Sequence, residues 1–134
     1  MTTEIEEILV QAIGRLGGAG FVSRRLPSDI GDEVFELFRE RDELEPVVAR
    51  LLAAAGKILV LNGPGLEQSQ SALVGSGFLR LNPAVVTVWL TSVALGRTKV
   101  RVHGIAKEGL IKQRGGQQVA REFALRLQQS VAAT

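Results

Sequence analysis

The period of the hydrophobic residues changes at Gly56, and this change constrains the fold more than any other feature of the sequence. Before Gly56, apolar residues recur at steps of three and four, which is typical of amphipathic helices. After Gly56 they form short runs or alternate with polar residues, which is typical of strands. The sequence therefore predicts helices first and a sheet afterwards.

Three helices are predicted before the change of period. Thr3 and Glu6 form a capping-box pattern at the start of the first helix, which ends at a Gly-Gly pair. Residues 30–40 carry apolar side chains at helical spacing, with acidic side chains around the rest of the axis. Pro46 suits the first position of a third helix, which ends at Gly56.

A meander of strands is predicted after Gly56, because short turns between strands require antiparallel pairing. The predicted strands cover residues 57–61, 78–81, 85–94, 98–106 and 110–113. The sequence Asn62-Gly63-Pro64-Gly65 is a turn signal, and polar, glycine-containing residues 68–77 predict a loop. Gly115-Gly116 then open a last amphipathic helix, which extends to Val131.

These elements predict an α+β fold. N-terminal helices are followed by an antiparallel β-meander of about four to five strands, and a C-terminal helix packs on one sheet face. A chain of 134 residues suits one domain, 1–134. Within it we expect an acidic helical part (1–56), a basic antiparallel sheet (57–113) and the C-terminal helix (116–131).

Charge is distributed unevenly along the chain. The whole carries a net charge of +2, but residues 1–67 sum to −5 and residues 68–134 to +7. Such asymmetry favours electrostatic association. One half can associate with the other, one copy with another, or the basic half with an anionic partner.

Composition excludes several kinds of chemistry. The chain has no cysteine, so disulfides, thiol nucleophiles and thiolate metal sites are excluded. His103 is the single histidine, which excludes multi-histidine metal sites, and no phosphate-loop motif follows the glycines. We expect no cofactor and no metal, and catalysis is less favoured than binding. The acidic N-terminus is unlike a secretion signal, and the apolar run 84–95 is too short to span a membrane, so we expect a soluble, cytoplasmic protein without a membrane partner.

The predicted strands 85–94 and 98–106 define the first candidate site. Burial of the valines on one face places Trp89 beside Lys99, Arg101 and His103 on the other, with Lys107 further along. Such a face can stack a nucleic-acid base on the aromatic ring while the cations contact phosphates. The alternative is that helices cover this face and Trp89 is part of the core.

The second candidate site precedes the last helix. Lys112 and Arg114 lie beside Gly115 and Gly116, whose amides are free at a helix N-terminus, and together they can bind a phosphate or carboxylate. Glycines at this position are also ordinary turn residues.

Three functions remain open. The favoured one is a small non-catalytic binding or assembly module that associates through complementary acidic and basic surfaces, with a protein partner or as a homo-oligomer. The second is a nucleic-acid-binding protein that uses the basic sheet face. The third is a small-molecule carrier or enzyme with a pocket between sheet and helices.

Overall fold

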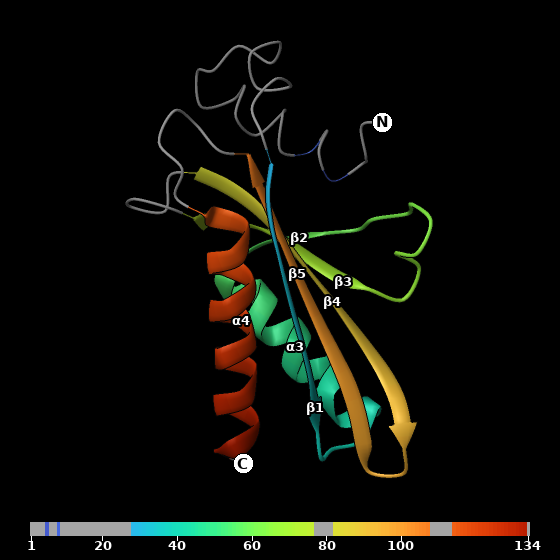
Figure 1. The fold of residues 1–134 in the computed structure, drawn as a ribbon. Helices are drawn as coiled ribbons and strands as arrows, with labels where there is room; N and C mark the ends of the chain where they lie inside the picture. The colour runs from blue at the N-terminus through green and yellow to red at the C-terminus, as the bar shows by residue number, and fades with distance from the viewer. Residues whose placement is uncertain (1–4, 6–7, 9–27, 77–81, 108–113, 134) are drawn as a thin grey trace.

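The computed structural model describes Ile5, Ile8 and residues 28–76, 82–107 and 114–133 (Figure 1). The described elements are β1 (Ser28–Leu37), α3 (Arg41–Ala55), β2 (Gly56–Leu59), β3 (Gln70–Ser76), β4 (Asn82–Ala94), β5 (Arg97–Lys107) and α4 (Gly115–Ala132). The prediction of an α+β fold with an antiparallel sheet and a C-terminal helix packed on it is confirmed.

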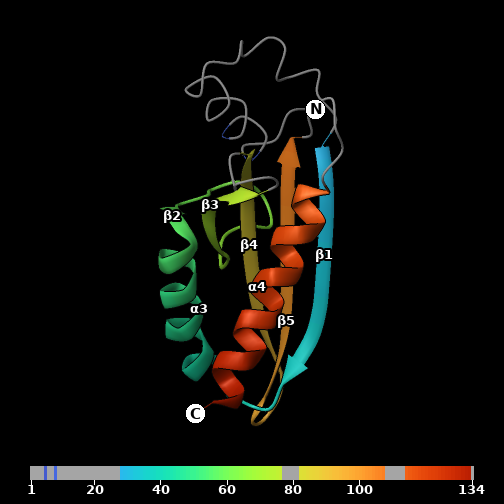
Figure 2. The ribbon, with the colours of Figure 1, turned by 90° about the vertical axis from the view of Figure 1, so that its left-hand side faces the viewer.

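The five strands form one sheet in the order β1-β5-β4-β3-β2, with every neighbouring pair antiparallel. Strands β2 to β5 are a meander, as predicted. Strand β1 adds to the far side of β5, so α3 carries the chain from one edge of the sheet to the other (Figure 2).

The prediction of a helix over residues 30–40 is wrong, because Ser28–Leu37 is the edge strand β1. A spacing of four residues places Ile30 and Val34 on one face of a helix, but it also places them on one face of a strand. Phe35 and Leu37 alternate with them and pack against the core on the opposite face. Gly31 is unfavourable in the interior of a helix and of a strand alike, so it does not distinguish the two.

Two further elements differ from prediction. Residues 68–77, predicted as a loop, contain strand β3, in which the buried Ala72 pairs with Ile58 of β2 and Val86 of β4. Helix α3 begins at Arg41, so Pro46 lies inside it. Ile5 and Ile8 are helical as predicted, and the predicted strands 78–81 and 110–113 lie outside the described residues.

Helices α3 and α4 cover the same face of the sheet, which we call the inner face (Figure 2). The main core lies between this face and the two helices. From the helices it contains Leu44, Val48, Leu52, Val119, Ala120, Phe123, Ala124 and Leu127. From the strands it contains Ala72, Ala84, Val86, Val88, Leu90, Val100, Val102 and Ala106.

Glycines allow α4 to approach the sheet closely. A Cβ on Gly104 of β5 would overlap the main-chain oxygen of Gly116, and a Cβ on Gly31 of β1 would overlap Gln117 Cα. A Cβ on Gly116 would in turn overlap the main-chain oxygen of Asp29. The helix thus packs backbone against backbone at its N-terminal end, where no larger residue fits.

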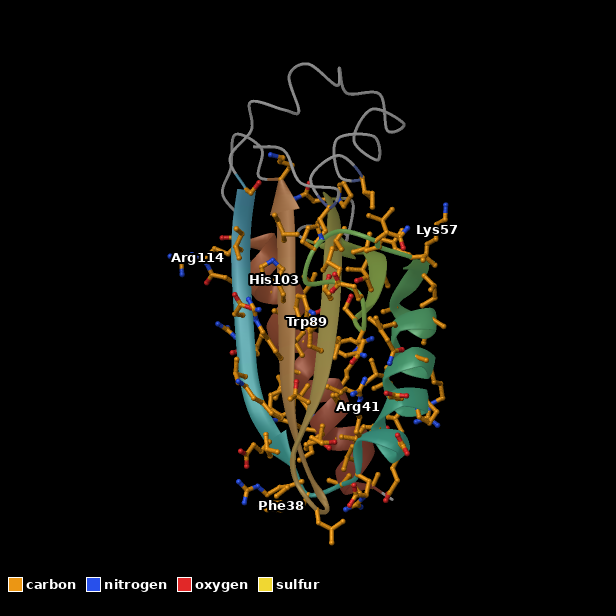
Figure 3. All side chains as sticks on the ribbon, turned by 90° about the vertical axis from the view of Figure 1, so that its right-hand side faces the viewer. Phe38, Arg41, Lys57, Trp89, His103 and Arg114 are labelled. Atoms are coloured by element: carbon orange, nitrogen blue, oxygen red, sulfur yellow. The ribbon has the colours of Figure 1, made fainter. Side chains whose placement is uncertain are left out.

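The opposite face of the sheet, which we call the outer face, is viewed in Figure 3. At one end of it Ile5 packs with Leu61, Val85 and Ile105 in a second buried cluster. Trp89 and His103 lie near the middle of the outer face (Figure 3). Among the described residues, no helix has both the length and the apolar character needed to cross a membrane.

Candidate functional site

Strands β4 and β5 place on each face the side chains that the alternation of the sequence predicts. Thr87 lies opposite His103, Trp89 opposite Arg101 and Thr91 opposite Lys99, all on the outer face. The valines between them point inward and are buried. Because the alternation of strands separates the two sets of side chains, burial of the valines brings Trp89 and the cations together.

An acidic residue that the sequence analysis did not place here completes the cluster. Asp32 of β1 lies opposite His103, and its Oδ1 is 2.9 Å from Arg101 Nε and 3.2 Å from His103 Nδ1. Partial burial alone would raise the pKa of Asp32, but hydrogen bonds from Arg101 and His103, together with their charges, outweigh it and hold that pKa below its usual value. Asp32 therefore stays ionised and neutralises part of the basic strand.

A second acid follows the same pattern one step further along β1. The Glu36 carboxylate is 2.9 Å from Arg97 Nε at the start of β5. Acids of the first half of the chain thus meet cations of the second half across the β1–β5 pair, and the association of the halves takes place within one protomer. The sequence contains a signal for this pairing. In β1 acids recur at every fourth position, and in β5 cations occupy alternate positions.

Trp89 is held in one orientation by its neighbours. Its indole N–H donates a hydrogen bond to the main-chain oxygen of Gly65 at 2.8 Å. The guanidinium carbon of Arg101 lies 4.9 Å from the ring centroid, a cation–π contact, and His103 makes an edge contact at 6.4 Å between ring centroids. The side chain of Arg101 therefore covers one face of the indole, which leaves less of the ring for a stacked base than the sequence suggested.

Lys99 differs from the two arginines of β5 because it makes no ion pair within the part of the chain that the structure describes. Glu36 lies opposite Lys99 in the ladder but binds Arg97 instead. Together with Gly65, Trp89, Thr91 and Arg101, Lys99 lines a depression of about 240 Å³ on the outer face.

Lys107, the last member of the first candidate site, is only 4% exposed. Its main-chain oxygen accepts a hydrogen bond from Asn82 Nδ2 at 2.8 Å. The cations of β5 thus do not form one continuous exposed row from Lys99 to Lys107, as a nucleic-acid backbone would require.

The second candidate site contains an anion from the chain itself. The Asp29 carboxylate accepts hydrogen bonds from the main-chain amide of Gln117 at 2.9 Å and from its side-chain amide at 3.1 Å. Gly115 and Gly116 are buried beneath this contact. Arg114 precedes them; it is exposed and has a φ of 53°. Lys112 lies outside the described residues. The hydrogen bonds from Gln117 to Asp29 attach the N-terminal end of α4 to β1.

A buried pair of hydroxyl groups joins β3 and β4. Ser71 and Thr87 are both buried, and the Ser71 hydroxyl donates a hydrogen bond to Thr87 Oγ1 at 3.0 Å. Within residues 28–76, 82–107 and 114–133, together with Ile5 and Ile8, no group of three or more histidine or carboxylate side chains could hold a metal ion.

A row of exposed apolar side chains runs along β1 and just beyond its end. Ile30 is 51% exposed, Val34 58% and Phe38, just beyond the strand, 76%. Figure 3 shows Phe38 at the end of the sheet where β1 finishes. We call these three side chains the β1 apolar row.

Comparison with models of known protein families gives no match, and comparison with curated proteins gives no significant match.

Proposed function

We propose that this protein is a non-catalytic binding module that takes up an extended, basic segment of a partner protein along the free edge of β1. The observation that carries the proposal is the β1 apolar row on a strand that, among the described residues, pairs on one side alone. Binding of this kind adds a strand to a sheet, with main-chain hydrogen bonds supplying affinity and alternate side chains supplying specificity.

Strand β1 carries charged side chains, which disfavour pairing with a like-charged strand, but it lacks the other features that usually protect a sheet edge. It is ten residues long, contains no lysine and no proline, and keeps an uninterrupted register with β5 from Ser28 to Leu37. Natural edge strands are commonly short, bulged or marked by lysine or proline. An edge without these features is a ready template for another strand.

The charge of β1 determines the chemistry of the partner. The strand contains four carboxylates and no cation; Arg97 and Arg101 bind two of them, and the amides of Gln117 hold a third, Asp29. Pairing of two β1 strands from two copies would bring like charges together along one ladder, which is unfavourable. A segment that alternates basic and apolar side chains would instead place cations beside the acids and apolar groups beside the β1 apolar row.

The test uses a fluorescein-labelled ten-residue peptide that alternates lysine and valine, measured by fluorescence polarisation at low and high salt. We expect saturable binding that weakens as salt rises, because the charges at the edge are exposed. The same peptide N-methylated at alternate residues loses the hydrogen bonds of one edge and should bind at least tenfold more weakly. Lack of binding at low salt, or equal binding of a glutamate–valine peptide, would overturn the proposal.

Variants localise the binding to β1. Ile30→Lys combined with Val34→Lys replaces exposed side chains, so the fold should be retained while the peptide Kd rises at least tenfold. Leu125→Lys on α4 is the matched control, since Leu125 is also half exposed, and it should leave the Kd unchanged. Equal effects of the two changes would contradict a site on β1.

Light scattering of the protein alone tests the other occupant, a second copy of the chain. We expect a monomer at low and high salt without the peptide. A dimer or larger assembly that the Ile30→Lys/Val34→Lys variant abolishes would assign the β1 edge to self-association, the homo-oligomer alternative, and overturn the assignment to a partner protein.

A further inference from the structure

We infer that the depression lined by Trp89, Lys99 and Arg101 is a binding site for a small organic anion, with its carboxylate or phosphate between the two cations. This site lies on the outer face and is independent of the binding proposed for the edge of β1. Trp89 and Arg101 form one cross-strand pair, and Thr91 and Lys99 form the next, so four neighbouring side chains of β4 and β5 converge on it.

Two of the lining groups are fixed by contacts within the protein. The hydrogen bond from the Trp89 indole to Gly65 orients the ring, and Asp32 binds Nε of Arg101 while the guanidinium lies over that ring. The bond to Asp32 uses Nε and leaves the terminal guanidinium nitrogens for a ligand. Groups that are held in place before binding lose less conformational entropy when the ligand arrives.

The electrostatics of the depression favour an anion. Lys99 brings a positive charge with no carboxylate partner among the described residues, because Glu36 is engaged by Arg97. Arg101 adds a guanidinium whose charge Asp32 balances in part, and its terminal nitrogens remain donors that suit a carboxylate or phosphate. A flat ligand body can then lie against the guanidinium–indole pair, while the Thr91 hydroxyl offers a hydrogen bond.

The size of the depression limits the ligand. Its volume of about 240 Å³ lies below the roughly 300–1,000 Å³ of sites for drug-sized molecules. A single small anion such as an aromatic carboxylate or a phosphate monoester is therefore the class that fits.

Intrinsic fluorescence gives a direct test, since Trp89 is the one tryptophan and the chain has no tyrosine. Benzoate, phenyl phosphate and inorganic phosphate are titrated separately into the full-length protein at low salt. We expect a saturable change in emission with at least one of the two aromatic anions, and none with uncharged benzamide. A response to inorganic phosphate alone would show that the site does not bind the aromatic ring of the ligand. An equal response to benzamide would show that the site does not require a negative charge on the ligand. Either result would overturn the inference.

Variants separate the site from a general attraction of anions to a cationic protein. Lys99→Gln and Arg101→Gln should each weaken binding at least fivefold. Lys57→Gln removes an exposed cation from β2, the strand at the edge of the sheet opposite β1, and should leave the Kd unchanged (Figure 3). The indole N–H signal in a ¹⁵N NMR spectrum follows the same titration and reports whether each variant keeps Trp89 in place.

A single-stranded oligothymidylate is the last ligand to be compared. Binding of the oligonucleotide with a steep salt dependence and much higher affinity than phenyl phosphate would make the depression part of a nucleic-acid surface and overturn the small-anion inference. Weak or no binding of the oligonucleotide, with phenyl phosphate or benzoate bound, would support it. Failure of this site would leave the peptide test on β1 unaffected, because the two experiments probe different residues.

Discussion

Replacing Gly104 by alanine should destabilise the protein by about 3 kcal/mol, the upper end of the cost of adding a group to a well-packed contact. A Cβ at this position would lie 2.8 Å from Val119 Cγ2 and closer still to the main-chain oxygen of Gly116, where ordinary contacts begin near 3.4 Å. The Gly116 oxygen belongs to the backbone and has no rotamer by which to withdraw. The N-terminal end of α4 must therefore move away from the sheet, which loosens the packing of Val119 and Phe123 in the core.

Urea unfolding followed by Trp89 fluorescence and by circular dichroism measures this change. With an m-value of about 1.5 kcal/mol/M, a loss of about 3 kcal/mol lowers the midpoint by about 2 M. Because domains of this size are commonly stable by about 5–15 kcal/mol, the variant should still fold in water and give a complete transition.

Gly65→Ala is the control for the removal of a glycine. A Cβ at Gly65 meets nothing within 4 Å, but its φ of +80° is unfavourable for alanine. That change should cost about 1 kcal/mol through the backbone alone. If Gly104→Ala proved no more destabilising than Gly65→Ala, the argument that α4 packs backbone against backbone would be refuted.

Three more expectations use the same unfolding assay. Asp29→Ala should cost about 1 kcal/mol because it removes the acceptor for the amide of Gln117, while Asp29→Asn, which keeps an oxygen, should cost less; equal losses would count against the cap. Asp32→Asn should lower the free energy of unfolding at pH 7 by roughly 0.2–1 kcal/mol. The folded-state pKa of Asp32 is lowered, so its stabilising contribution is complete above the unfolded-state pKa of about 4 and is lost as the pH falls through the lower folded-state pKa. Wild type and variant should therefore converge only as the pH falls from about 4 through that lower value. Thr87→Val should lower the free energy of unfolding by about 1–2 kcal/mol, because it leaves the buried Ser71 hydroxyl unpaired. Adding Ser71→Ala should recover part of that loss. Strict additivity of the two changes in a double-mutant cycle would exclude coupling between the two hydroxyl groups.

The sequence was sufficient to predict the structure where apolar and polar residues alternate over a long strand and one face of that strand is buried. Strands β4 and β5 have 13 and 11 residues, and their valines determine which side chains reach the outer face. That pattern alone predicted that Trp89 shares a face with Lys99, Arg101 and His103; the pairing of Trp89 with Arg101 was found in the structure. The last helix was equally predictable from its apolar stripe and its opening glycines.

The sequence was insufficient where an element depends on a partner distant in the chain. Strand β1 has a helix-compatible spacing of apolar residues, and its identity is decided by pairing with β5, about 70 residues later. Asp32 consequently went unrecognised as the residue that holds Arg101, and Asp29 as the carboxylate at the start of α4. Local propensity could not identify these contacts because tertiary pairing overrides it in short segments.

The uneven charge of the chain acquires a physical explanation from the β1–β5 pair, but charge alone does not determine how the two strands align. The ion pairs of Asp32 and Glu36 are about half exposed and contribute on the order of 0.2–1 kcal/mol each. The observed register also places Gly31 opposite Gly104, directly under the N-terminal end of α4. A slip of β1 by two residues would keep its inward and outward alternation. It would also replace Gly31, at the contact with the N-terminal end of α4, by a residue whose Cβ does not fit there. Exclusion of a side chain at this contact is stronger than attraction between exposed charges, so the glycines select the register and the charges then pair within it.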